Sequence, residues 1–90
     1  MSDAFLNKAK RLAAEDYNKH NAGRTITTEH VYVVWFSKTL GNWKALVSTD
    51  VLPGLYWEIT HNGAKQETYV DLYSKVTNTV IPDSMKEANA

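Results

Sequence analysis

The segment VYVVWFSKTLGNWKALVST, residues 31–49, decides how this chain folds. Residues 31–36 are apolar at every position and rich in valine and aromatic side chains, which predicts a β-strand. Residues 43–49, WKALVST, predict a second strand. Between them, Leu40-Gly41-Asn42 is typical of a turn in which glycine supplies a positive φ. We therefore expect a hairpin. Because residues 31–36 are apolar on both alternating faces, we expect an interior strand, covered on two sides or paired across an interface.

Two more strands are expected after this hairpin. The Pro-Gly pair at residues 53–54 interrupts the chain, and residues 55–60 alternate in polarity as a third strand. The Asn-Gly pair at residues 62–63 is the strongest short-range hairpin signal in the sequence. A fourth strand is therefore predicted to begin near Lys65.

The second turn also predicts which side chains share a face. If residues 62–63 form a two-residue turn, Ile59 pairs with Gln66 and Glu58 lies opposite Glu67, a mildly destabilising like-charge pair. Either the register differs or Lys65 offsets the two charges. One face of this hairpin then carries Leu55, Trp57, Ile59, Val70 and Leu72, and the other carries Tyr56, Glu58, Thr60, Tyr69, Asp71 and Tyr73.

An amphipathic helix precedes the strands. Within residues 2–20, apolar side chains recur at spacings of three and four, which places them on one helical face. Asp16 falls inside this apolar arc, and we expect it to bind a neighbouring loop or to lie at the end of the stripe, because a buried carboxylate needs a partner. Residues 24–30 predict a polar connection with one helical turn capped by Thr27 or Thr28.

The C-terminal part is the least regular. Residues 75–81 are rich in β-branched side chains and predict an extension of the fourth strand or a fifth short strand, with a helix as the alternative. Residues 82–90 have little apolar content and predict a frayed tail. Ninety residues suffice for one core. We expect a single α+β domain over residues 1–81, an N-terminal amphipathic helix packed on one face of an antiparallel sheet of about four strands.

Composition excludes several classes of function. The chain has no cysteine, which rules out disulfides and thiolate metal sites and is compatible with a reducing cytoplasm. Its formal net charge is zero, so it has no general attraction to nucleic acid or anionic lipid. No run approaches the roughly 20 apolar residues that cross a bilayer. We therefore expect neither export nor membrane insertion.

Motifs for catalysis are also missing. The histidines at positions 20, 30 and 61 form no metal-ligand pair, and the four glycines are scattered rather than gathered in a phosphate-binding loop. Carboxylate pairs such as Glu58 with Asp71 are explained by a charged solvent face. The sequence therefore predicts a protein that is not an enzyme and that has no metal site and no cofactor.

Aromatic side chains are the most informative surplus: three Trp, five Tyr and two Phe. One helix covers one face of a sheet, and we expect Trp57 and two of residues 34–36 on that side. The second face is left with Tyr56, Tyr69, Asp71 and Tyr73. Tyrosines that alternate with charges suit a surface that binds a protein partner, and they suit an ordinary solvated strand equally well. A homodimer that buries this same face is a further alternative.

A second class of function rests on the first turn. Lys38 near residues 35–36 and Lys44 beside Trp43 resemble the combination of charge and stacking in proteins that bind single-stranded nucleic acid. Two cations on a chain of zero net charge would neutralise few phosphates, so this hypothesis is weaker. A small-ligand-binding domain or a minimal enzyme is a third alternative, which requires a concave pocket.

A resemblance adds a biological setting. The stretch at residues 31–49, continued by YWEITHNG at residues 56–63 and ETYVDLY at residues 67–73, resembles a family of small uncharacterised proteins from phages and prophages of Gram-positive bacteria. That family has no assigned function and provides no active residues. The resemblance implies an accessory protein that works in the cytoplasm of a bacterial host.

Overall fold

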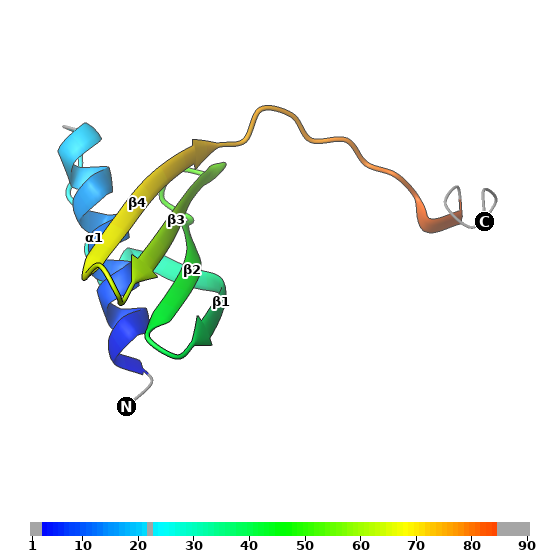
Figure 1. The fold of residues 1–90 in the computed structure, drawn as a ribbon. Coiled ribbons are helices and arrows are strands. Elements are labelled where there is room, and N and C mark those ends of the chain that lie inside the picture. Colours follow the sequence, from blue (N-terminus) through cyan, green and yellow to red (C-terminus); the bar gives the residue numbers. More distant parts are fainter. Residues whose placement is uncertain (1–2, 22, 85–90) are drawn as a thin grey trace.

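The fold is one long helix packed on one face of an open antiparallel sheet, as Figure 1 shows. The structure is a computed structural model that describes residues 3–21 and 23–84. The strands follow one another in the order β1-β2-β3-β4 and each is antiparallel to its neighbour. This confirms the predicted α+β class. The elements are α1 (Asp3–His20), a short 3-10 helix η1 (Thr28–His30), β1 (Val31–Thr39), β2 (Asn42–Thr49), β3 (Leu55–Asn62) and β4 (Glu67–Ser74).

Helix α1 docks through the apolar stripe that the sequence predicts. Phe5 and Tyr17 are buried near the two ends of the helix, and Ala9 and Ala13 between them are fully buried. Alanine has only a methyl side chain, so the helix backbone can approach the sheet closely at its middle. Against this stripe pack the buried strand residues Trp43, Ala45, Val47, Trp57 and Ile59.

Asp16 has a core partner. Its Oδ2 accepts a hydrogen bond of 3.0 Å from the indole Nε1 of Trp57, which is 0% exposed and lies edge-on to the ring of Tyr17. The prediction that Asp16 binds a loop or lies at the end of the stripe is therefore wrong. The largest buried side chain brings a polar N–H into the core, and a donor there needs an acceptor.

The connection from α1 to β1 is held by side chains rather than by regular structure. Asn18 binds both backbone groups of Ile26: Oδ1 accepts from its N–H at 2.8 Å, and Nδ2 donates to its carbonyl at 2.9 Å. This pins Ile26, which is 2% exposed, into the core. Thr27 caps η1, as predicted.

Strand β1 lies at the edge of the sheet, so the prediction that it is an interior strand of this chain's own sheet is wrong. The alternative, that it pairs across an interface, stays a prediction. Its pairing with β2 shifts register between Val33 and Trp35, where a β-bulge takes up one residue. Beyond the bulge, Phe36 faces α1 and lies 5.4 Å from Phe5 between ring centroids, whereas Trp35 faces the other side of the sheet. Residues 31–36 are therefore apolar on both faces of a strand that lies at the edge of the sheet, and the bulge changes the face on which the later side chains lie.

The β3–β4 turn is longer than predicted. Asn62 pairs with Glu67, which leaves residues 63–66 in the turn, with Gln66 at φ 55°. Ile59 consequently pairs with Val70 instead of Gln66. This register differs by four residues from the prediction, and because four is even, every side chain stays on its predicted face.

The two hairpin turns touch each other. The backbone N–H of Gly63 donates to Oδ1 of Asn42 at 2.9 Å, and a Cβ at Gly63 would lie 2.3 Å from the carbonyl oxygen of Gly41. In the first turn Leu40, not Gly41, takes the positive φ of 55°. Gly63 is therefore required for close approach between turns, and its N–H serves the neighbouring hairpin.

Residues 75–82 form neither a strand nor a helix, so the predicted strand over residues 75–81 is wrong. Lys75 donates its backbone N–H to the carbonyl of Gly54 at 2.7 Å, and beyond this point the chain runs away from the sheet (Figure 1). Of the predicted tail, residues 85–90 lie outside the described residues. Within the described part, no helix is long and apolar enough to cross a membrane.

Candidate functional site

The sheet face that is turned away from α1, called here the open face, carries three rows of side chains across the strands. Partners in an antiparallel pairing share a face, so the registers define each row. An aromatic row lies near the end of β4, a central row mixes apolar and acidic residues, and a polar row lies nearer the turns. The rows are Tyr32-Ser48-Tyr56-Tyr73, Trp35-Leu46-Glu58-Asp71 and Ser37-Lys44-Thr60-Tyr69.

All four residues predicted for a binding face lie on the open face. Tyr56 pairs with Tyr73 at its aromatic end, and Tyr69 and Asp71 alternate along β4. The rings are accessible: Tyr69 is 43% and Tyr73 is 53% exposed. The geometry thus brings together the tyrosines that the alternation of β3 and β4 indicates.

Sequence reasoning missed two aromatic residues of this face. Tyr32 and Trp35 of β1 are 46% and 45% exposed and lie in the aromatic and central rows. Tyr32 could have been placed by continuing its row from Tyr56 through Ser48. Trp35 could not be placed by alternation, because the bulge changes the face on which the later residues of β1 lie.

Glu58 lies in the central row of the open face and contacts a residue of each of the other two rows. Its carboxylate forms an ion pair of 3.1 Å with Lys44 Nζ and accepts a 3.1 Å hydrogen bond from the hydroxyl of Tyr73. These two contacts hold the pKa of Glu58 below its ordinary value of 4.5. Glu58 lies opposite Asp71, and Lys44 offsets this like-charge pair. The predicted opposition of Glu58 and Glu67 is wrong.

Both exposed tyrosines of β4 donate to carboxylates. The hydrogen bond to Glu58 raises the pKa of Tyr73, and a hydrogen bond from the Tyr69 hydroxyl to Glu67 raises the pKa of Tyr69. These hydrogen bonds orient the two rings, and about half of each residue remains exposed. A ring that is already oriented loses less entropy when it contacts a partner.

Replacing Glu58 with glutamine tests this network. In the variant Glu58→Gln, we expect the pKa of Tyr73 to fall toward the ordinary tyrosine value, because the anion that disfavours tyrosinate is removed. The pKa of Tyr69, whose partner is Glu67, should stay raised and serves as the internal control. NMR titration of the ring carbons bearing the hydroxyls measures both. An unchanged Tyr73 pKa would contradict the network.

The three residues proposed for nucleic-acid stacking do not come together. Trp43 is 8% exposed and is enclosed by Phe5, at 5.2 Å between ring centroids, and by the stacked ring of His61, at 5.5 Å. Lys38 pairs with Trp43 and so lies on the α1 side, whereas Lys44 projects from the open face. The prediction that these residues form a stacking site is wrong, because Trp43 belongs to the core.

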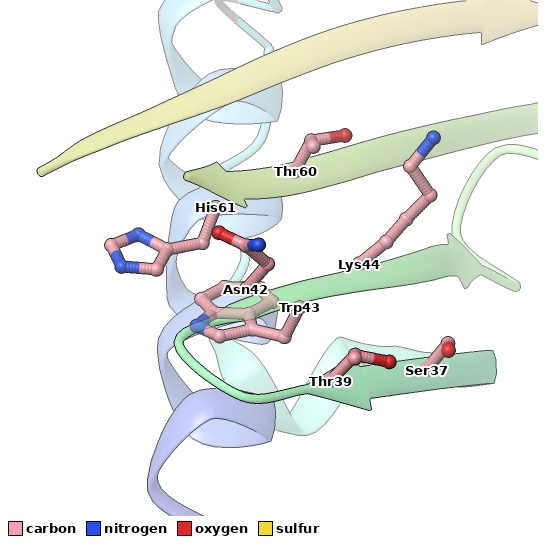
Figure 2. Close-up of a pocket in the computed structure, with 7 residues that line it drawn as sticks. All are labelled: Ser37, Thr39, Asn42, Trp43, Lys44, Thr60 and His61. Carbon is pink, nitrogen blue, oxygen red and sulfur yellow. The ribbon is translucent and has the colours of Figure 1, made fainter. Parts of the chain in front are cut away.

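A depression of about 270 Å³ lies where the first three strands approach their turns, as Figure 2 shows. Three of its polar side chains have partners that serve the fold. Lys44 pairs with Glu58, Asn42 holds the turn at Gly63, and the His61 Nδ1 lies 2.9 Å from the hydroxyl of Thr68. The depression therefore adds a polar rim to the open face.

A second depression, of about 380 Å³, lies between α1 and β4. Asp16 and Thr68 contribute polar groups to it, and the carboxylate of Asp16 is already bound to Trp57 and lies 3.6 Å from Nδ1 of His20.

Across residues 3–21 and 23–84, no group of three or more histidine or acidic side chains is placed to hold a metal ion.

Comparison with known proteins gives a family but no activity. The model of a family of unknown function, DUF6275, matches residues 6–83. No curated protein and no solved structure matches the chain. The match includes α1 from residue 6 onward, all strands of the sheet and the segment that follows β4. Since it spans most of the 90 residues, the chain belongs to this family of unknown function, DUF6275.

Proposed function

We propose that this chain is a non-enzymatic accessory protein of a phage or prophage, which binds a host or phage protein in the bacterial cytoplasm through its open face. The observation that carries the proposal is the set of exposed, oriented tyrosines on that face. Tyr69 and Tyr73 each donate a hydroxyl hydrogen bond to a neighbouring carboxylate and expose about half of the side chain.

The composition of the open face supports a protein partner. Tyrosine and tryptophan give large contact areas with few rotatable bonds, and such residues dominate binding energies at protein interfaces. Tyr32, Trp35 and Tyr73 provide the apolar area, and Lys44, Glu58 and Asp71 provide charges of both signs. Mixed charges around aromatic residues favour a specific protein surface over a uniformly charged polymer.

Single-stranded nucleic acid remains a less favoured occupant of the same face. Its stacking residue would have to be Trp35 or a tyrosine, since Trp43 is buried. Lys44 is engaged by Glu58, and Asp71 lies next to Glu58 across the strands, so the local charge opposes a phosphate chain. Titration with an oligonucleotide at about 50 mM and 200 mM salt separates the two, because phosphate contacts predict marked weakening over this range.

The binding proposal is tested by removing the two tyrosines of β4. We expect the double variant Tyr69→Ala and Tyr73→Ala to retain its partner at least roughly tenfold less well than the wild type, because a central interface tyrosine contributes about 1–2 kcal/mol. Affinity purification from a lysate of a Gram-positive bacterium, with quantitative mass spectrometry, measures the loss.

A matched control comes from the same strand. Leu72 lies between the two tyrosines, is 42% exposed and points to the α1 side, so Leu72→Ala should leave the partner bound. Circular dichroism establishes that each variant is folded. Equal recovery of the same partners by the wild type and a folded double variant would reject the open face as the binding surface.

A further inference from the structure

The outer edge of β1 is unpaired. β1 is nine residues long and pairs on one side with β2, and no other strand among residues 3–21 and 23–84 adjoins its outer edge. Its side chains are exposed on both faces of the sheet, with Trp35 45% and Phe36 52% exposed. The bulge at residues 33–35 and Lys38 give this edge partial protection. A long, apolar edge is a template for pairing with a further strand.

The segment at residues 75–81 could supply a strand for this edge, because its composition favours a strand and it has no strand partner. It reads KVTNTVI, and its three apolar side chains are exposed: Val76 at 93%, Val80 at 81% and Ile81 at 59%. Its start is fixed by the hydrogen bond from Lys75 to Gly54, and Figure 1 shows the rest leaving the sheet. The family match extends to residue 83 and therefore includes this segment.

We propose that two copies of this chain associate by exchanging strands, with residues 75–81 of each copy added to the outer edge of β1 of the other. The exchange would pair the backbone groups of both elements. Val76 and Val80 lie on one face of an extended segment, and there they would cover exposed apolar side chains of β1. This proposal goes beyond the binding function of the open face, and each can fail without the other.

A second copy fits better than the chain's own β1. β4 and β1 lie at opposite edges of the sheet, about 14 Å apart for three strand spacings. Crossing that distance takes about four extended residues, which would leave about three of residues 75–81 for pairing. In a second copy, the whole segment can pair.

The absence of cysteine allows a direct test of this contact. Two single-cysteine proteins are prepared, Val34→Cys in β1 and Thr79→Cys in the segment. They are mixed at a protein concentration of about 0.1 mM, which suits a small interface, and are then treated with oxidised glutathione. We expect disulfide-linked heterodimers in the mixture. The control replaces Val34→Cys with Lys65→Cys, an exposed position in the β3–β4 turn, and should give at least tenfold less product.

Light scattering on the uncrosslinked protein completes the test. The wild type should be a dimer, and Thr79→Pro, which removes a backbone donor from the segment, should shift it to monomer with an unchanged circular dichroism spectrum. A monomeric wild type, equal crosslinking at Lys65→Cys, or crosslinking within a single chain that carries both cysteines would each overturn the proposal. So would a dimer that survives Thr79→Pro and dissociates in the double tyrosine variant, since that dimer would use the open face.

Discussion

Replacing Trp57 with alanine is expected to lower the free energy of unfolding by about 3–5 kcal/mol, as for other large-to-small changes in a core. Trp57 is 0% exposed, lies edge-on to Tyr17 at 6.4 Å between ring centroids and donates its indole N–H to Asp16. The variant loses the apolar burial of the ring and leaves Asp16 without its core donor. Small domains are stable by about 5–15 kcal/mol, so this loss is a large fraction of the total.

The chain offers a matched control for this change. Trp35→Ala removes the same atoms from a side chain that is 45% exposed on the open face, and we expect a loss of about 1 kcal/mol or less. Urea unfolding followed by far-ultraviolet circular dichroism measures both variants. Equal losses for the two tryptophans would show that burial under α1 does not govern the stability of the domain.

Much of this fold could be predicted from the sequence because its signals are local and periodic. The three- and four-residue spacing in α1 and the alternation in β3 and β4 each specify a buried face, and the structure confirms both. The predicted faces of β3 and β4 are correct although the predicted turn at residues 62–63 is wrong, because the register error is an even number of residues. Periodicity determines which face a side chain occupies more reliably than it determines its partner.

The wrong predictions concern residues whose structure depends on a contact with a distant part of the chain. The Asn-Gly pair at residues 62–63 does not form a two-residue turn, and the Gly63 N–H is bonded to Asn42 of the other hairpin. Asp16 looked out of place on its helix because its donor, Trp57, lies 41 residues away. Neither partner is visible in a local window of sequence.

The candidate site could be predicted in part for the same reasons. The alternation of β3 and β4 indicates Tyr56, Tyr69, Asp71 and Tyr73 on one face, and the registers place them there. Strand alternation does not say which face the helix covers. The helix covers the face on which Trp43 lies, so Trp43 belongs to the core and not to the predicted stacking site. Strand order, which makes β1 an edge, also has no local signal in the sequence.

Replacing Gly63 with alanine is the second change with a large expected effect, a loss of about 1–3 kcal/mol of unfolding free energy from overpacking. The added Cβ would lie 2.3 Å from the carbonyl oxygen and 2.9 Å from the carbonyl carbon of Gly41. Both are backbone atoms of a turn held between paired strands, so no side-chain rotation relieves the contact. The positive φ that often explains a turn glycine is found at Gly54, so the effect at Gly63 is steric.

Gly41→Ala separates this steric effect from the general effect of removing a glycine. A Cβ at Gly41 meets its nearest atom at 3.9 Å, an ordinary contact. Both substitutions stiffen the unfolded chain by the same amount, about 0.4–1 kcal/mol, so that contribution cancels when the two variants are compared by urea unfolding. If Gly63→Ala proves as stable as Gly41→Ala, the two turns do not touch in solution. If it is less stable by the expected margin, the two turns are in contact in solution, and this contact holds the polar rim of the open face in place.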